Sequence, residues 1–498
     1  MDSVIMGQRP YSERELARLV RAAQASVSRR ERPAAESLLV HSLIATLAKR
    51  LTGFSQANQP LRALDEIRLA FTGTNARRRG FPSNTNLQVE ATIDPLALRR
   101  LGEPVPRGAA GYLELAHRAD PLPWLSLNAR ERFALRSPSD TGVPRQRAEL
   151  LLAGARARFR NVALTLGREQ VAWGHGADDG LFIASDAPAL DLISIAGDQP
   201  FTLPGPLRRL GQTQATLVVA DLGASRSHSH SRLVAYKVSV RPTRTLELGG
   251  TFENHFGGAG SRSSPTLARL FDLLPFIDIF RRHNYTDTTR TLDPESDKVI
   301  GADVRLRLDR LGGLTLSGEW LIDDFDVHRV MSLLTSAGSH SFAVVIPRLL
   351  SPSVSMRLSA KHMGLATYSH GTLLNGLTTR GRLLGDELGP NAKAFGGELR
   401  WLSSPSLMVA LEGRSAIYSD ARYFNCPTGL PGCTEYVLFT ISREPDELRD
   451  QVVGTLTLSP SSALNLFVRA GSERVRNQVG MGGTRHGYVA DVVVRWQP

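Results

Sequence analysis

Alternation of apolar and polar residues, repeated in segment after segment from about residue 85 onward, limits the possible folds of this chain most strongly. The clearest example is VRLRLDRLGGLTLSGEW, in which Val304, Leu306 and Leu308 alternate with charged residues and Gly312-Gly313 separates two such runs. A period of two places each class of side chain on one face of a strand, and a Gly-Gly pair between two runs is typical of a hairpin. The same alternation returns at 234–241, 246–253, 354–361 and 487–498. The sequence therefore predicts a mainly β protein.

The connections between these segments differ sharply in length. Periodicity alone fits both a soluble sandwich, with its apolar face in the core, and a transmembrane barrel, with its apolar face toward lipid. Short turns, such as 160–161, 242–244, 403–406 and 459–463, alternate with long polar connections at 254–299, 362–394 and 414–450. Short turns at one end and long loops at the other are typical of outer-membrane barrels. We therefore predict a large antiparallel transmembrane β-barrel of about 16–18 strands over residues 84–498.

The first 83 residues have a helical pattern instead. Ser12 and Glu15 in YSERELARLV have the spacing of a capping box, and a second amphipathic segment runs from about Ala34 to Leu51. Both segments are too polar on one side to span a bilayer, and no apolar run approaches eighteen residues. We expect residues 1–83 to form a helical region that packs against the rest of the protein. MDSVIMGQRPYSERE has no signal-peptide pattern, so an outer-membrane location further implies that a targeting segment is missing here.

Charge and cysteine content leave several alternatives open. The net charge is +12, and most of the basic residues are arginine. This excess is explained either by coding bias or by a surface or lumen that attracts anionic groups, whereas the spread of the arginines argues against nucleic-acid binding. Cys426 and Cys433, in CPTGLPGC, are close enough to form a disulfide in an oxidising compartment, but two unpaired thiols remain the alternative.

Several stretches resemble the Wzi-type capsule assembly family of outer-membrane barrels. These are LGREQVAWGHGADDGLFIASDAPALDLISI, RPTRTLELGGTFENHFGGAG, EWLIDDFD, YSHGTLLNGLTTRGRLLGDELGPNAKAFGGELRWL and DSVIMGQRPYSERELARLV. Each is short or rich in glycine, so the resemblance depends on their order and spacing along nearly the whole chain. One departure is Asp186 in the Asp-Ala-Pro turn, where the family more often has Asn. The resemblance implies a barrel of about 18 strands, a periplasmic helical bundle, no enzymatic activity and a role in holding exported polysaccharide at the cell surface.

Two loops contain the candidate binding residues. Trp173, His175, Asp178 and Asp179 lie in a glycine-rich stretch, where the tryptophan could stack on a sugar ring, although the acidic pair could simply solvate a turn. The second loop, ASRSHSHSR, could bind a glycan carboxylate or a lipopolysaccharide phosphate, or could be an ordinary solvated loop. Its candidate residues are Arg226, His228 and His230.

An acidic group follows the second strand of the hairpin described above. Glu319, Asp323, Asp324 and Asp326 fit ion pairs with lumenal arginines such as Arg305 and Arg307, or else a divalent-cation site.

The sequence favours an outer-membrane protein that anchors or helps assemble capsular polysaccharide or exopolysaccharide. We expect polysaccharide and outer-membrane lipids, including lipopolysaccharide, as partners, and a monomeric protein without catalytic residues, metal or cofactor. The alternative is a porin-like channel for anionic sugars. An outer-membrane hydrolase would need a Ser/His/Asp cluster that we cannot assemble from the sequence, and no Gly-x-Ser-x-Gly, Walker or zincin motif is present.

Overall fold

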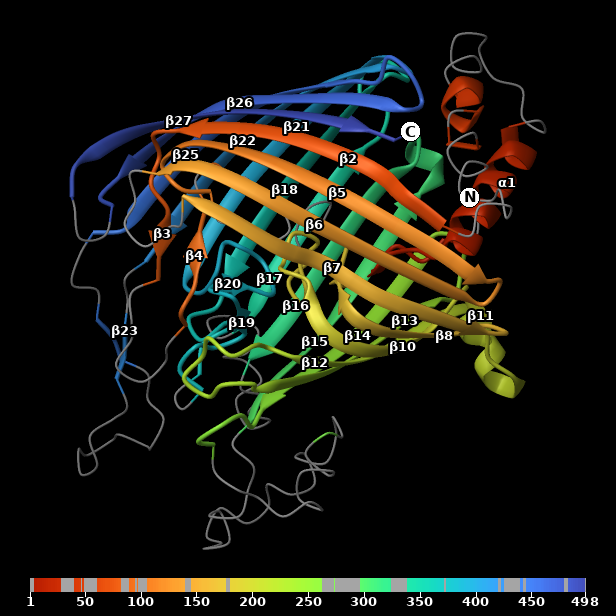
Figure 1. The fold of residues 1–498 in the computed structure, drawn as a ribbon, viewed down its shortest axis with the longest axis horizontal. Helices are drawn as coiled ribbons and strands as arrows, with labels where there is room; N and C mark the ends of the chain where they lie inside the picture. Colours follow the sequence, from red (N-terminus) through yellow and green to blue (C-terminus); the bar gives the residue numbers. More distant parts are fainter. Residues whose placement is uncertain are drawn as a thin grey trace, which may run out of the picture.

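The alternating segments form the strands of a closed antiparallel barrel in the computed structural model (Figure 1). The structure describes residues 4–27, 40–45, 47–48, 61–81, 89–94, 96, 105–138, 145–175, 180–261, 273, 296–323, 338–370, 373–419, 422–424, 439–441, 445–478 and 482–497. Cys426 and Cys433 lie outside these residues, so their pairing stays a prediction.

The barrel has 18 strands in the described part of the chain, at the upper limit of the predicted number. They are β2 (Leu61–Thr74), β5 (Gly108–Leu122), β6 (Leu125–Pro138), β7 (Gln146–Phe159), β8 (Val162–Glu169), β10 (Leu190–Gly197), β12 (Gln212–Asp221), β13 (Arg232–Arg241), β14 (Leu246–Phe256), β15 (Ser296–Leu308), β16 (Leu314–Asp323), β17 (Ser339–Ile346), β18 (Val354–Met363), β21 (Ala392–Ser404), β22 (Leu407–Tyr418), β25 (Glu447–Leu458), β26 (Leu464–Arg476) and β27 (Thr484–Trp496). Antiparallel pairing of β2 with β27, with Phe71 opposite Val492, closes the barrel.

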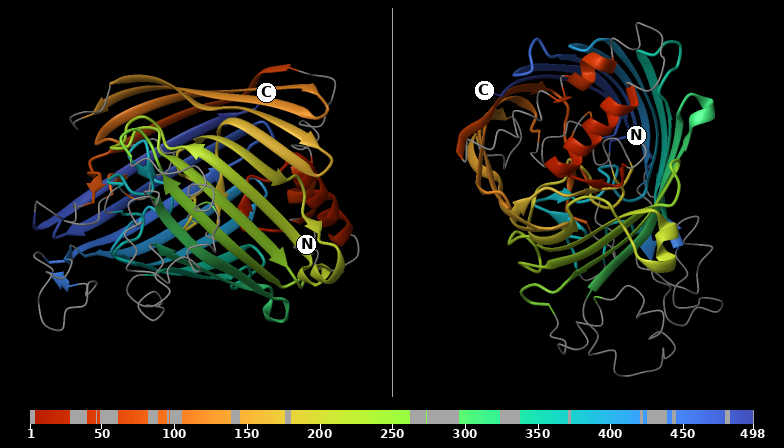
Figure 2. Two further views of the ribbon diagram at one scale, coloured as in Figure 1. Left: turned by 90° about the horizontal axis from the view of Figure 1, so that it is seen from below. Right: turned by 90° about the vertical axis from the view of Figure 1, so that its right-hand side faces the viewer.

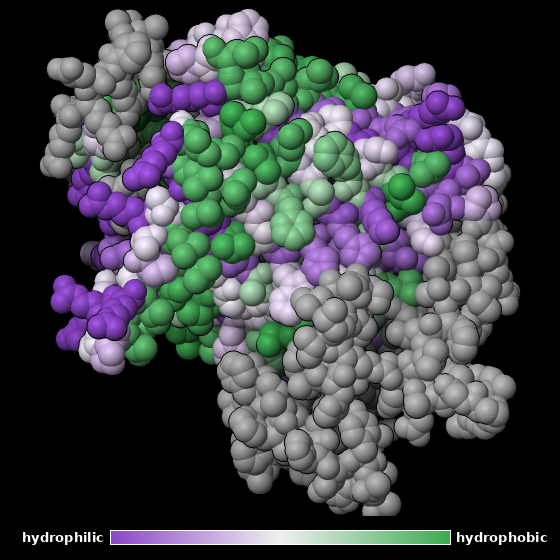
Figure 3. All heavy atoms as spheres, turned by 180° about the vertical axis from the view of Figure 1, so that it is seen from behind, coloured by the Kyte–Doolittle hydropathy of each residue, from purple (hydrophilic) through white to green (hydrophobic). Residues whose placement is uncertain are grey.

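Burial of the side chains distinguishes the two architectures that periodicity left open. Lys237 on β13 is completely buried, whereas Phe395 on β21 is 61% exposed. Across the barrel the apolar face of the strands points outward and the charged face inward, the reverse of a soluble sandwich. Figure 3 shows the outward apolar residues gathered in a band, with hydrophilic residues on both sides of it. The predicted transmembrane barrel is therefore confirmed.

Short and long connections between the strands occur at opposite ends of the barrel, as predicted. Strands joined by the short turns 123–124, 160–161, 242–245, 405–406 and 459–463 meet at one end of the barrel, and strands joined by long connections, such as 257–295, 364–391 and 419–446, meet at the other. The predicted hairpin at 304–320 is present, with a 3-10 turn, η4 (Asp309–Leu311), between β15 and β16. In outer-membrane barrels the short turns face the periplasm, which orients this molecule.

Helix α1 (Glu13–Val27) lies across the short-turn end of the barrel (Figure 2). The Ser12 hydroxyl accepts a hydrogen bond from the Glu15 amide at 3.1 Å and donates one to the Asp198 carbonyl at 2.7 Å. Ser12 therefore caps the helix as predicted. The Glu15 carboxylate pairs with Arg18 instead of the Ser12 amide, so the described residues show only this half of the predicted capping box. An ion pair between Glu13 and Arg118 of β5 adds a second link between helix and barrel.

The predicted boundary between helical region and barrel, at residue 84, is too late. β2 begins at Leu61 and pairs with both β5 and β27, so it is a full member of the barrel. The alternation in LRALDEIRLAFTGT is interrupted by a register shift between Arg62 and Glu66, which hides the period of two at its start. Of the second predicted helix, residues 40–45 and 47–48 are described and are helical.

Within the described residues, no helix has the length and apolarity needed to cross a membrane.

Candidate functional site: the plugged lumen

Two of the long connections fold back into the barrel and fill part of its lumen. We call the described residues of 170–189 and 364–391 the plug. Figure 1 shows the plug elements β19 (Thr378–Thr379) and β20 (Arg382–Leu383) in front of the inner wall, and the N-terminal segment also enters the lumen (Figure 2). Trp173, Phe182, Tyr368 and Leu384 of the plug form one buried apolar cluster with residues of the barrel wall.

Trp173 is packed inside the plug rather than presented to a ligand. Its side chain is 1% exposed, its amide donates to the Ile183 carbonyl at 2.8 Å, and it pairs with Gln8 through the short strands β1 (Gln8–Arg9) and β9 (Ala172–Trp173). A Cβ at Gly180 would lie 1.8 Å from the Trp173 carbonyl oxygen, so glycine is required for this close approach. In this conformation the indole ring stabilises the plug and cannot stack on a sugar.

Carboxylates on the barrel wall bind the backbone of the plug. Glu319 of β16 accepts hydrogen bonds from the amides of His175 at 2.5 Å and Leu181 at 2.7 Å. Asp323, near the plug at the end of the same strand, accepts one from the Tyr368 amide at 2.6 Å. Charge-assisted hydrogen bonds of this kind are about twice as strong as neutral ones. The acidic strand end therefore holds the plug in place.

The sequence suggested ion pairs of these carboxylates with Arg305 and Arg307, and it did not reveal their hydrogen bonds to the backbone of the plug. Arg307 instead pairs with Asp309 at 2.8 Å. The sequence could not show the difference, because backbone amides that fold in from distant loops have no pattern of their own. Asp324 and Asp326 lie outside the described residues. Among the residues that are described, no group of three or more His, Cys, Asp or Glu is placed to hold a metal ion.

His175 belongs to a buried charged cluster on the same wall. Its Nε2 lies 2.7 Å from Oδ1 of Asp303, which also pairs with Lys237. The Lys237 ammonium in turn lies 5.5 Å from the centre of the Phe182 ring, a distance that suits a cation–π contact. His175 therefore connects plug to wall. Asp178 and Asp179 lie outside the described residues, so their contact with sugar stays a prediction.

The basic loop between β12 and β13 is divided between structural and exposed residues. The Arg226 guanidinium donates to the carbonyls of Gly376 and Thr378 in the plug, and Nη2 lies 3.1 Å from Nε2 of His255. Burial lowers the pKa of Arg226 to about 10. His230, by contrast, is exposed and lies 2.7 Å from Asp221, and His228 is half-buried at the same loop. Arg226 thus fastens the loop to the plug, while the two histidines lie nearer to solvent.

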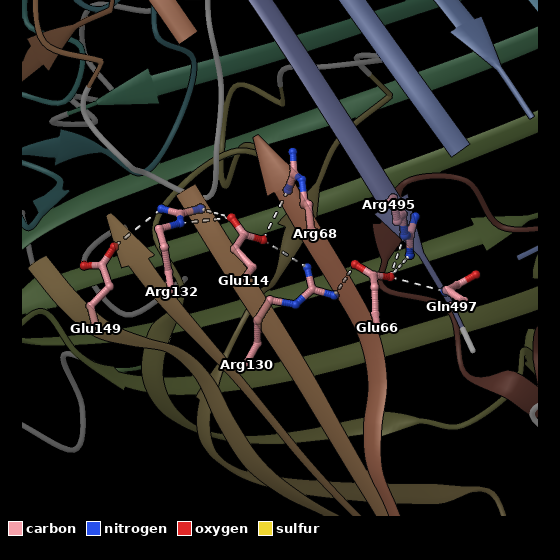
Figure 4. Close-up of polar contacts among 8 residues, drawn as sticks. All are labelled: Glu66, Arg68, Glu114, Arg130, Arg132, Glu149, Arg495 and Gln497. Atoms are coloured by element: carbon pink, nitrogen blue, oxygen red, sulfur yellow. Dashed lines mark hydrogen bonds and ion pairs between the residues drawn. The ribbon is translucent and has the colours of Figure 1, made fainter. Parts of the chain in front are cut away.

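A row of alternating charges crosses the opposite part of the wall (Figure 4). Arg132 pairs with Glu114 at 2.7 Å and with Glu149 at 3.4 Å, and Arg130 bridges Glu114 and Glu66. Arg68 and Arg495 complete the row. We did not single out these residues from the sequence. The sequence does contain opposite charges at inward positions of neighbouring strands. They can be recognised as pairs only when the strand register is known.

Among the described residues, two of the cavities lie against the inner wall of the barrel. One, of about 290 Å³, lies between the N-terminal segment and β6, β8, β10 and β12, and is lined by Tyr11, Gln8 and Glu169 among others. The second, of about 280 Å³, lies against β18, β21, β22, β25 and β26 and is rich in arginine.

The family model of the capsule assembly protein Wzi matches residues 77–424, which is more than half of the chain. The chain belongs to the Wzi capsule assembly family. It is therefore a β-barrel of the outer membrane, as the sequence predicted. No sequence of a curated protein matches the chain.

A solved structure agrees with this membership at the level of the fold. The structure of Wzi, an outer membrane protein involved in group 1 capsule assembly in Escherichia coli and described as a carbohydrate-binding β-barrel, superposes with a TM-score of 0.67 at 14% identity, covering 99% of this chain and 94% of that one. OccD3 of Pseudomonas aeruginosa gives a TM-score of 0.48 at 8% identity, covering 88% of this chain and 93% of that one. OprD of the same organism gives 0.44 at 8% identity, covering 88% and 96%.

Proposed function

We propose that this Wzi-family barrel holds capsular polysaccharide or exopolysaccharide at the cell surface without catalysing a reaction, as an anchor and not as a channel. Family membership supports the link to capsule assembly. The E. coli Wzi, whose barrel this one resembles, is described as carbohydrate-binding, and we extend that property to this chain. The observation that carries the choice of an anchor is the plug, whose buried cluster joins the barrel wall.

The plug is attached on several sides, which argues against an open channel. Glu319 and Asp323 bind it from β16, Arg226 binds it from the β12–β13 loop, and Lys361 of β18 pairs with its Asp386 at 2.5 Å. At the short-turn end, Glu247 accepts hydrogen bonds from the Met6 and Gly7 amides, both at 2.9 Å. Opening a continuous pore would require most of these contacts to break together.

The long-loop end is where we place the contact with exported polysaccharide. His228 and His230, with Asp178 and Asp179, are the candidate residues that could reach a glycan there. Trp173, His175 and Arg226 support the site indirectly, since each holds the plug under the loops. We further propose that lipopolysaccharide surrounds the apolar band and that the protein is a monomer, because the closed barrel needs no second copy to satisfy its strand edges.

Conductance and capsule retention together test this function. We expect the purified protein to show no large, steady conductance in planar bilayers, and cells that lack the gene to lose surface-attached polysaccharide. Complementation with the intact gene is the control. Steady porin-like conductance would favour the channel for anionic sugars, and unchanged amount and attachment of polysaccharide in the deletion strain would contradict the proposal.

A further inference from the structure

Strands β25, β26 and β27 lie side by side in the barrel wall (Figure 1). Their outward side chains change from apolar to charged toward the long-loop end. The pairing register places Val452, Ser472 and Tyr488 in one row across the three strands. Tyr488 is 58% exposed and Val452 is 54% exposed, on the face that meets lipid. Because exposed aromatic side chains border the apolar band of outer-membrane barrels, this row marks the outer edge of the band.

The next outward row toward the long-loop end is polar and charged. It consists of Asp450, Arg474 and His486, which the register places opposite one another. Arg474 and His486 are exposed, whereas the neighbours of Arg474 along β26, Glu473 and Val475, are buried on the lumenal side. Two residues along a strand span about 7 Å. The side chains of Arg474 and His486 therefore point outward, about one row beyond the edge of the apolar band.

A second arginine is held beside Arg474 on the same outward face. Nη2 of Arg476 lies 3.2 Å from Oδ2 of Asp450, whose Oδ1 accepts a hydrogen bond from the Ser415 hydroxyl at 2.7 Å. Among the described residues, no carboxylate pairs with Arg474. We call Arg474, Arg476 and His486 the outer basic patch. Two guanidinium groups beside one carboxylate leave this part of the surface with a net positive charge.

The position of the outer basic patch determines which anion it meets. Outward side chains just beyond the apolar band lie at the level of the lipid headgroups, and basic side chains at that level bind anionic headgroups. A guanidinium group donates two parallel hydrogen bonds to a phosphate, and the N–H of an imidazole adds a further donor. At the long-loop end of an outer-membrane barrel, the patch faces the leaflet that contains lipopolysaccharide, whose lipid anchor carries phosphates.

We propose that the outer basic patch binds a phosphate of lipid A, the lipid anchor of lipopolysaccharide, while acyl chains of the same molecule pack against Tyr488 and Val452. This inference rests on the proposed function, in which lipopolysaccharide surrounds the apolar band, and it assigns residues to that contact. A soluble acidic glycan would meet the charged row alone. A phosphorylated glycolipid meets the charged row and the apolar row beside it, so the continuity of the two rows favours the lipid.

Native mass spectrometry of the full chain in a neutral detergent tests the proposal. The probes are purified bisphosphorylated lipid A and the same lipid after removal of its phosphates. We expect the phosphorylated lipid to bind at least about tenfold more tightly, because only its phosphates engage the guanidinium groups. The double variant Arg474→Gln, Arg476→Gln should lose about tenfold or more of the affinity for phosphorylated lipid A. It should bind the dephosphorylated lipid as the unsubstituted protein does.

A matched variant and two competitors separate the alternatives. Arg208→Gln, Arg209→Gln removes two exposed arginines of the 3-10 helix η2 (Gly205–Leu210), at the short-turn end, and should leave the affinity unchanged. Circular dichroism checks that all variants are folded barrels. Equal affinity of unsubstituted protein and Arg474/Arg476 variant for phosphorylated lipid A would overturn the inference. Displacement of the lipid by an equal concentration of inorganic phosphate, or tighter arginine-dependent binding of trigalacturonic acid, would also overturn it.

Failure of this inference is distinguishable from failure of the proposed function. If the Arg474/Arg476 variant binds phosphorylated lipid A as the unsubstituted protein does, the outer basic patch is not a lipid site, while capsule retention still depends on the barrel and its plug. If the deletion strain keeps its polysaccharide unchanged, the anchoring function is wrong, whereas phosphate-dependent binding of lipid A to the purified protein is measured without any polysaccharide.

Discussion

Single carboxylates on the lumenal wall determine where the plug sits. Glu319 is buried and accepts two plug amides, and Glu247 does the same for two amides of the N-terminal segment. A carboxylate is suited to this position because it has acceptor sites for several donors at once and strengthens each bond by its charge. Loss of one such carboxylate leaves buried amides without a hydrogen-bond acceptor, and this raises the free energy of the folded state.

We therefore predict that Glu319→Gln loosens the plug while the barrel stays folded. The amide side chain keeps one oxygen but loses the charge, which weakens two hydrogen bonds and costs about 1.5–3 kcal/mol locally. Hydrogen exchange should become faster at the His175 and Leu181 amides, with brief current openings in bilayers. The control is Asp450→Asn, which removes a more exposed carboxylate that pairs with Arg476. Unchanged exchange at both amides would show that Glu319 does not hold the plug.

Helix α1 acts as one element at the short-turn end of the barrel. Its N-terminus is linked to the β10–β12 connection through Ser12 and Asp198, and to β5 through the ion pair of Glu13. The segment before it continues into the lumen, where the Gly7 carbonyl accepts the Gly174 amide of the plug at 2.9 Å. Helix, N-terminal segment and plug are thus one connected chain of contacts.

We predict that Ser12→Ala frays the first turn of α1. The variant loses the N-cap, worth about 1 kcal/mol, and the hydrogen bond to the Asp198 carbonyl. Limited proteolysis should cleave the variant near residues 12–16 faster than the native protein. The gel band of the barrel fragment should stay unchanged. Ser12→Asp, which can still accept the Glu15 amide but cannot donate to Asp198, should restore part of the resistance. Equal cleavage of native protein and Ser12→Ala would contradict this role.

The whole molecule is stabilised in a membrane because its apolar residues face outward. Phe71, Leu135 and Phe395 are all exposed on the outer face, while the charged partners of the lumen are paired inside. In lipid a closed barrel satisfies all strand hydrogen bonds and leaves no edge. In water the same apolar band would favour aggregation.

We predict that Leu411→Arg destabilises the protein in lipid vesicles by about 2–4 kcal/mol, the cost of a cation near the middle of the bilayer. Leu411 of β22 is 55% exposed on the outward face. Thr457→Arg is the control, because Thr457 of β25 is opposite Met408, which lines the second lumenal cavity, and so points to the polar lumen. Urea unfolding followed by tryptophan fluorescence measures both. Equal loss of stability in the two variants would contradict the assigned faces.

The sequence alone determined the strands, the barrel class and the long-loop end, because a period of two and unequal turns are local properties of the chain. It also identified Ser12 as a helix cap from the residues beside it. It placed the start of the barrel too late, since the irregular register between Arg62 and Glu66 interrupts the pattern of β2.

Only the tertiary structure decided which candidate residues work together. Trp173 and Arg226 resembled ligand-binding residues in the sequence, yet both are buried in contacts that hold the plug. Glu319 meets the Leu181 amide across 138 residues, and Arg414 meets Glu387 only because a loop folds into the lumen. Such pairs depend on barrel closure, strand register and loop insertion, and none of these leaves a periodic signal along the chain.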